Sequence, residues 1–144
     1  MKVAELLKNK GQKVITIDPQ ESIFIAMKRL LEHNIGSLVA CDSEGRIVGI
    51  ISERDILRAV YLDRNALDSK KVADIMTPEV IVTIPDDELD YVMGIMTQNR
   101  IRHLPVVTKE GIVGIVSIGD IVKFQLHETQ VKNRYLEDYM YSQL

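Results

Sequence analysis

The sequence predicts an α+β fold made of two tandem copies of one β-α-β-β-α unit. The segment 19–45 aligns with 85–111 at a constant offset, and 49–55 aligns with 114–120 one residue closer. Both copies end in the same pattern: glycine, two apolar residues, serine, two further residues and aspartate. Within each copy, apolar residues at helical spacing give way to short continuous apolar runs. A co-linear register of this length indicates an internal duplication.

The two copies open alike, because 2–7 and 71–76 share the pattern lysine, valine, alanine, acid and two apolar residues. A polar linker and a β-branched run with strand character follow, at 8–13 and 14–17, and at 77–79 and 80–84. Apolar residues then recur at i, i+3, i+4 and i+7 within 23–31 and 89–96, which predicts a helix with one buried face.

Two apolar runs joined by a short turn that ends in glycine come next in each copy and predict a hairpin. The runs and turns are 35–40, 42–45 and 47–51 in the first copy, and 102–107, 108–111 and 112–116 in the second. Runs this apolar predict strands buried on both faces. Pro105 cannot donate to a ladder, so its strand should lie at a sheet edge or beside an opening. Ser52 and Ser117 then cap the last helix of each copy.

These boundaries divide the chain into a first repeat with its opening helix (1–69), a second repeat (70–126) and a helical tail (127–144). The connector 62–70 is expected to be a helix end plus a loop. In the tail, Val131, Tyr135 and Tyr139 recur at helical spacing. Two interpretations stay open: the tail packs on its own domain, or it contacts another subunit, since tyrosine is enriched at interfaces.

Composition excludes several classes of function. A net charge of −3 gives no general attraction to nucleic acid, and no apolar run is long enough to span a membrane. One cysteine, Cys41, fits a reducing cytoplasm, and its apolar surroundings favour an inert thiol. The three histidines and Cys41 lack metal-ligand spacing, and no Gly-x-Gly-x-x-Gly motif occurs. We therefore expect no enzymatic activity, no metal and no catalytic cofactor.

The repeated serine and aspartate carry the functional hypothesis. A carboxylate at a strand-to-helix corner can accept hydrogen bonds from the two hydroxyls of a ribose. The same pair can also do no more than cap the first turn of a helix. Gly114 and Gly119 have the spacing of a phosphate loop, but Asp120 stands where that motif needs lysine and would repel phosphate. The duplicated pair favours a ribose contact.

The repeat, its serine-to-aspartate ending and the strand Leu104-Pro105-Val106 together resemble the cystathionine-β-synthase (CBS) domain. Two tandem copies resemble a CBS pair, or Bateman module. The resemblance implies two repeats packed about a pseudo-two-fold axis, with two clefts for AMP, ADP, ATP, NAD or S-adenosylmethionine. It also implies a homodimer of such pairs that senses its ligand and regulates a partner protein.

The same resemblance assigns roles to residues. Asp55 and Asp120 match ribose-binding carboxylates, with Ser52 and Ser117 as adjacent hydroxyls. Each cleft is expected to combine one aspartate with the early strand of the other repeat. The ligand-binding residues that it implies are Thr16, Ile17, Ser37, Ser52, Arg54, Asp55, Thr83, Ile84, Arg102, His103, Pro105, Ser117 and Asp120.

The two clefts are expected to be unequal. Thr83 and Ile84 would face Asp55, and Thr16 and Ile17 would face Asp120. Arg54, Arg102 and His103 would lie near Asp55, so that its cleft takes the more phosphorylated ligand, because guanidinium groups fork onto phosphate oxygens. The alternative function is a structural or protein-interaction dimer module with empty or vestigial clefts.

Overall fold

A computed structural model describes residues 1–10 and 14–142 and confirms the α+β class. The first repeat contains β1 (Thr16–Ile17), α2 (Ile23–His33), β2 (Ser37–Cys41), β3 (Ile47–Ser52) and α3 (Glu53–Leu62). The second contains α6 (Leu89–Asn99), β4 (His103–Thr108), β5 (Gly111–Ser117) and α7 (Ile118–Ser142). Three further short helices are α1 (Val3–Lys10), α4 (Ala66–Ser69) and α5 (Val72–Ile75).

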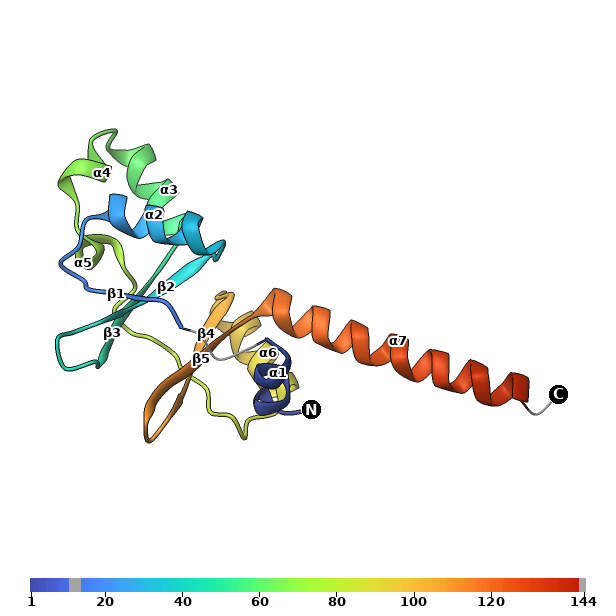
Figure 1. Cartoon of the computed structure of the whole chain (residues 1–144). Helices are drawn as coiled ribbons and strands as arrows, with labels where there is room; N and C mark the ends of the chain where they lie inside the picture. Colours follow the sequence, from blue (N-terminus) through green and yellow to red (C-terminus); the bar gives the residue numbers. More distant parts are fainter. Residues whose placement is uncertain (11–13, 143–144) are drawn as a thin grey trace.

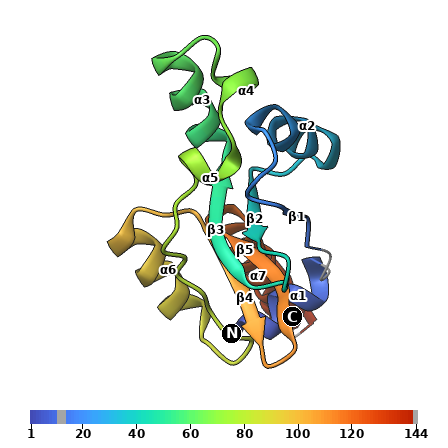
Figure 2. The ribbon, with the colours of Figure 1, turned by 90° about the vertical axis from the view of Figure 1, so that its left-hand side faces the viewer.

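The two predicted hairpins are confirmed. β2 pairs antiparallel with β3, and β4 pairs antiparallel with β5. Both hairpins have a register shift at the same aligned place, between Ala40 and Cys41 and between Val106 and Val107, as a duplication requires. The hairpins lie next to each other at the centre of the molecule, with helices toward both ends (Figures 1 and 2).

Burial differs between the strands of each hairpin. β2 is mostly buried along its length, and β4 is buried from Leu104 to Val106, as the continuous apolar runs predict. β3 and β5 instead alternate between buried and half-buried positions. The prediction of burial on both faces was wrong for these two strands, because every second side chain faces a partly open side of the sheet.

The predicted strand at 80–84 is reduced to one parallel bridge at Thr83, whereas β1 pairs with β2 over two residues. Pro105 explains the difference. It occupies the position that Val39 has in the first repeat. Its carbonyl accepts a hydrogen bond from the Thr83 N–H at 2.9 Å, but proline has no N–H to donate back to the segment 80–84. β4 is therefore fully paired only with β5, which confirms the expected edge position of the proline strand.

The opening helix of each repeat packs on the other repeat. The Val3 N–H donates to the Asp87 carbonyl at 3.0 Å, and the Val72 N–H donates to the Glu21 carbonyl at 2.8 Å. α1 thus supplies Val3, Leu6 and Leu7 to the second core, whereas α5 supplies Val72 to the first. This exchange fastens the repeats to each other by apolar burial as well as by backbone hydrogen bonds.

Two glycines allow the opening segment of each repeat to pack closely against a strand of the other repeat. A Cβ at Gly49 would overlap the side chain of Met76, and a Cβ at Gly114 would overlap that of Leu7. The two contacts are equivalent under the duplication, as expected for repeats related by a pseudo-two-fold axis. The connector between the repeats contains the short helix α4, where the sequence indicated only a helix end and a loop.

The predicted tail is not a separate element, because α7 runs without a break from Ile118 to Ser142. Its first turns pack on the second repeat through Ile121, and its remaining turns project away from the body (Figure 1). Residues 129–141 are all exposed, so the tail does not pack on its own domain.

Candidate functional site

A cavity of about 720 Å³ opens between the two repeats. Its size is in the range of small-molecule sites in proteins. The side of the first repeat is formed by the start of α3 and its neighbouring strands, and the opposite side by the segments that precede α6 and β4. The lining residues are Gly36, Ser37, Ile50, Ser52, Glu53, Arg54, Asp55, Leu57, Arg58, Thr77, Glu79, Val80, Ile81, Arg100, Ile101, Arg102 and His103.

The charges around this cavity come from both repeats. Arg54 and Arg58 project from α3, one helical turn apart, while Arg100 and Arg102 lie just before β4. Four arginines and the acidic residues Glu53, Asp55 and Glu79 thus line the same cavity. A cavity with both signs of charge suits a ligand that carries anionic groups and hydroxyl donors at different ends.

Asp55 sits in a capping box at the start of α3. Its Oδ2 accepts from the Ser52 N–H at 2.9 Å and from Ser52 Oγ at 3.1 Å. The Asp55 N–H donates in return to Ser52 Oγ at 3.3 Å. Oδ1 lies 3.9 Å from an Arg58 nitrogen, beyond hydrogen-bond distance. The carboxylate is held in place through one oxygen, and the other can accept a hydrogen bond from a ligand.

His103 lies between the two aspartate positions. It lines the cavity beside Asp55, and it pairs across the hairpin with Ser117, next to Asp120. Burial, followed by the positive charge of Lys10, lowers the pKa of His103 below its ordinary value, against the opposing effect of nearby carboxylates. The lowered pKa favours the neutral imidazole.

The segment 77–81 forms the opposite wall of the cavity. The Thr77 N–H and carbonyl exchange hydrogen bonds with Ile50 at 2.9 and 3.0 Å, which ties this segment to β3. Pro78 follows directly, and since proline disfavours a helical residue before it, α5 ends at Ile75. The chain continues without helical structure past the cavity, where Val80 and Ile81 offer apolar surface.

Thr83 and Ile84 were expected at this wall but do not line the cavity. The Thr83 side chain is buried, and its hydroxyl donates to Asp87 Oδ2 at 2.5 Å. The Ile84 N–H donates to the same oxygen at 3.0 Å. Hydrogen bonds from both residues to Asp87 thus close the turn before α6. The residues that reach the cavity come two to six positions before Thr83 in the chain.

Asp120 repeats the capping arrangement but has an additional partner. Its Oδ2 accepts from the Ser117 N–H at 3.1 Å and also from Lys10 Nζ, with which it forms an ion pair. Lys10 Nζ donates as well to the Ile115 carbonyl at 2.5 Å. Burial raises the pKa of Asp120, but the hydrogen bonds from Lys10 and Ser117 lower it more, so that its net pKa lies below the usual value.

The cavity brings together six of the predicted site residues: Ser37, Ser52, Arg54, Asp55, Arg102 and His103. The other seven lie outside its lining: Thr16, Ile17, Thr83, Ile84, Pro105, Ser117 and Asp120. Sequence reasoning missed Arg58 and Arg100. Helical spacing could have indicated Arg58, which follows Arg54 by four residues. Arg100 ends α6 with a left-handed φ of 56°, and no pattern marks it as facing a cavity.

Other chemistry has little support in the described residues. Among 1–10 and 14–142, no group of three or more histidine, cysteine, aspartate or glutamate side chains is placed to hold a metal ion. None of the helices in this part of the chain is long and apolar enough to cross a membrane. Burial and the neighbouring Asp42 raise the pKa of Cys41, which disfavours the reactive thiolate.

A comparison with protein families assigns the fold. The CBS domain family model matches residues 3–62 and 72–127, which are the two repeats with their opening helices. The chain belongs to the CBS domain family. On this assignment it is a regulatory CBS domain pair.

Among curated proteins, the chain is 34% identical over 146 residues to a CBS domain-containing protein from Arabidopsis thaliana that is described as mitochondrial. That alignment covers 96% of this chain and 71% of the plant protein. The chain spans 66% and 43% of the length of two other curated relatives.

Solved structures confirm the arrangement of the repeats. A CBS-domain protein from Agrobacterium tumefaciens superposes with a TM-score of 0.81 at 39% identity, over 85% of this chain and 91% of that one. The CBS domain pair of protein MJ0100 superposes with a TM-score of 0.76 at 34% identity, over 86% and 98% of the two chains. That pair was solved in complex with 5′-methylthioadenosine and S-adenosyl-L-methionine.

Proposed function

We propose that this chain is a sensor of adenosine-containing ligands, and that it binds one such ligand in the cavity beside Asp55. The observation that carries the proposal is the meeting of one available carboxylate oxygen and four guanidinium groups around a single cavity between the repeats. A ligand with a ribose at one end and phosphate at the other satisfies both kinds of group.

The ribose end is assigned to Asp55. Ser52 holds one carboxylate oxygen and leaves Oδ1 for the ligand. A hydrogen bond to a charged acceptor contributes about 1.5–3 kcal/mol in such a setting. The adenine would lie against the apolar side chains of Val80 and Ile81, within reach of backbone groups of the segment 77–81.

The phosphate end is assigned to the arginines. Arg54 comes from one repeat and Arg102 from the other, so that an anionic ligand between them bridges the two halves. AMP, ADP, ATP and NAD all carry the required phosphate. S-Adenosylmethionine carries the ribose without phosphate. The complex of the MJ0100 domain pair supports an adenosine ligand, and both of its ligands are of this phosphate-free kind.

A ligand that bridges the repeats favours one of their relative orientations, and the energy available is its difference in affinity for the two states. A change in orientation would act on a partner protein whose identity the sequence does not specify. Energy sensing in the cytoplasm is the role that we propose for an AMP-, ADP- or ATP-binding form of this mechanism.

Exposed apolar side chains support the proposal that the chain forms a homodimer. Leu57, Tyr61 and Leu62 on α3 and Leu31 on α2 are all more than 70% exposed. Clusters of large apolar side chains at a surface mark interaction sites. A dimer with empty clefts is the alternative function, and these side chains fit it equally well.

A thermal-shift panel separates the two functions. Purified protein is heated with AMP, ADP, ATP, NAD, NADH or S-adenosylmethionine, beside the Asp55→Ala and Asp120→Ala variants. A ligand that binds only the folded state raises the melting temperature according to its occupancy. We expect a rise with at least one ligand that is lost in Asp55→Ala. No rise with any of them contradicts the sensor and leaves the interaction module.

A further inference from the structure

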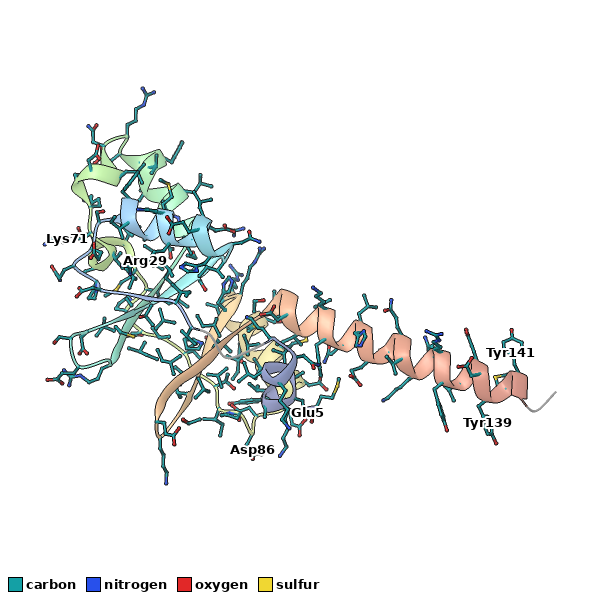
Figure 3. All side chains as sticks on the ribbon, in the orientation of Figure 1. Glu5, Arg29, Lys71, Asp86, Tyr139 and Tyr141 are labelled. Atoms are coloured by element: carbon teal, nitrogen blue, oxygen red, sulfur yellow. The ribbon has the colours of Figure 1, made fainter. Side chains whose placement is uncertain are left out.

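The last four turns of α7 have no place in the function described so far. The family match ends at residue 127, while α7 continues to Ser142. In Figure 3 this part of the helix stands clear of the rest of the molecule, with Tyr139 and Tyr141 near its far end. Isolated helices of this length are marginal in water, and most helices are stabilised by packing of one face.

The exposed part of α7 has an apolar face. Val131, Tyr135 and Tyr139 are between 53% and 69% exposed. Their spacing of four residues places them along one side of the helix. Ile121 and Phe124, which pack on the second repeat, lie on the same side. The face that holds α7 on its own body thus continues beyond it.

Charge along this segment is divided. Lys132 and Arg134 come first, whereas Glu137 and Asp138 come near the end, and the last turn has no basic residue. Acidic residues near a helix C-terminus are unfavourable, because the carbonyl ends carry partial negative charge. These acidic residues therefore destabilise an isolated α7, and a basic partner near its C-terminus would offset that effect.

We infer that α7 pairs with α7 of a second copy of this chain, in antiparallel orientation over residues 128–142. A pairing centred on Tyr135 sets Val131 opposite Tyr139 of the other helix and places Arg134 beside Asp138 of the other helix, on the same flank of the contact. Basic residues of each copy then offset the acidic end of the other. A parallel pairing would instead set like charges against each other.

The geometry of the molecule permits this pairing. Because α7 projects from one end of the body (Figure 1), an antiparallel partner helix would carry its own body to the opposite end. The paired surface is separate from the exposed side chains on α2 and α3. Association through both surfaces would build an assembly larger than a dimer.

Two sets of full-length variants test the pairing. Tyr135→Cys lies on the apolar face, and its matched control Asn133→Cys lies on the opposite side of the same helix. Under mild oxidation we expect a reducible covalent dimer from Tyr135→Cys and several-fold less from Asn133→Cys and the wild type, whose one cysteine is half-buried in β2. Equal cross-linking at both positions overturns the pairing.

A charge exchange tests the orientation. Arg134→Glu and Asp138→Arg should each weaken association by about tenfold, because each breaks two symmetric pairs and sets like charges together. The double variant R134E/D138R should restore it. Sedimentation velocity measures all four proteins. Association that is unchanged in both single variants, or absent in the wild type, overturns the proposal and assigns α7 to a different partner.

Discussion

The strand-to-helix corners that contain Asp55 and Asp120 have the same local structure but different charged neighbours. In each, a serine at the end of a strand and an aspartate three residues later exchange hydrogen bonds. Asp55 has one oxygen available and four arginines around its cavity. Asp120 is instead paired with Lys10. The two repeats share the hydrogen bonds that cap the helix, but they differ in the charged residues around the aspartate.

The difference originates in the opening segments. Lys10 and Glu79 occupy corresponding positions, since 2–7 aligns with 71–76. Pro78 stops α5, and the chain passes the Asp55 cavity in a non-helical course. α1 has Asn9 at the position of Pro78 and continues to Lys10, whose ammonium group reaches Asp120. One helical turn thus decides which carboxylate has its charge offset by a lysine.

The largest effect is expected at Asp55. Asp55→Ala removes the ribose acceptor and should weaken binding of the identified adenosine ligand by about 10- to 100-fold. Asp120→Ala should change the affinity less than about threefold, because its carboxylate is already paired. Isothermal titration measures both. An equal loss of affinity in the two variants would mean that the two clefts are equivalent, which would contradict the difference between the Asp55 and Asp120 corners.

The next largest effect is expected at Arg102. Arg102→Ala should weaken ATP binding by about tenfold through loss of a charge-assisted contact, and should leave adenosine binding nearly unchanged. Arg46→Ala is the matched control, because Arg46 lies in the β2–β3 turn, outside the cavity lining. If both variants bind ATP like the wild type, the phosphate assignment is wrong.

A smaller effect is expected at Lys10. Lys10→Met frees Asp120, and a second, weaker binding event should become two- to fivefold tighter, as expected for loss of a partly exposed ion pair of at most about 1 kcal/mol. Lys8→Met, also exposed on α1, serves as the control. A second event that is unaffected by Lys10→Met would show that the ion pair does not restrict this cleft.

The smallest effect concerns pH. The folded pKa of His103 is lowered, so the unfolded chain binds more protons as the pH falls below about 6.5. Unfolding free energy should therefore decrease between pH 7.5 and 5.5, by at most about 1.4 kcal/mol per pH unit from this group. Urea titrations of the wild type and of His103→Gln measure it, with the exposed His127→Gln as control. The same pH dependence of the unfolding free energy in all three proteins would contradict its assignment to His103.

The sequence predicted most of the fold because the duplication repeats local signals. Helical spacing gave α2 and α6, and the turns ending in Gly45 and Gly111, both at positive φ, gave the hairpins. The strand at 80–84 was overpredicted, because a β-branched run says nothing about a missing donor on its partner strand. Pro105 determines that outcome from a different part of the chain.

The site was predicted less completely, for a related reason. Ser52 and Asp55 are local to one corner, and the motif identifies them. Arg58 and Arg100 reach the cavity only through the way in which the repeats meet, and Lys10 reaches Asp120 through the exchange of opening helices. Such long-range pairings depend on tertiary packing, which a single sequence does not encode in any short pattern.

The stoichiometry of ligand binding shows whether the Asp55 and Asp120 corners differ in function. Wild-type protein is titrated calorimetrically with the ligand that gives the largest thermal shift. We expect one high-affinity site per chain, at Asp55, and at most a much weaker second binding event. Two equal sites per chain, or one site that is lost in Asp120→Ala and kept in Asp55→Ala, would contradict it.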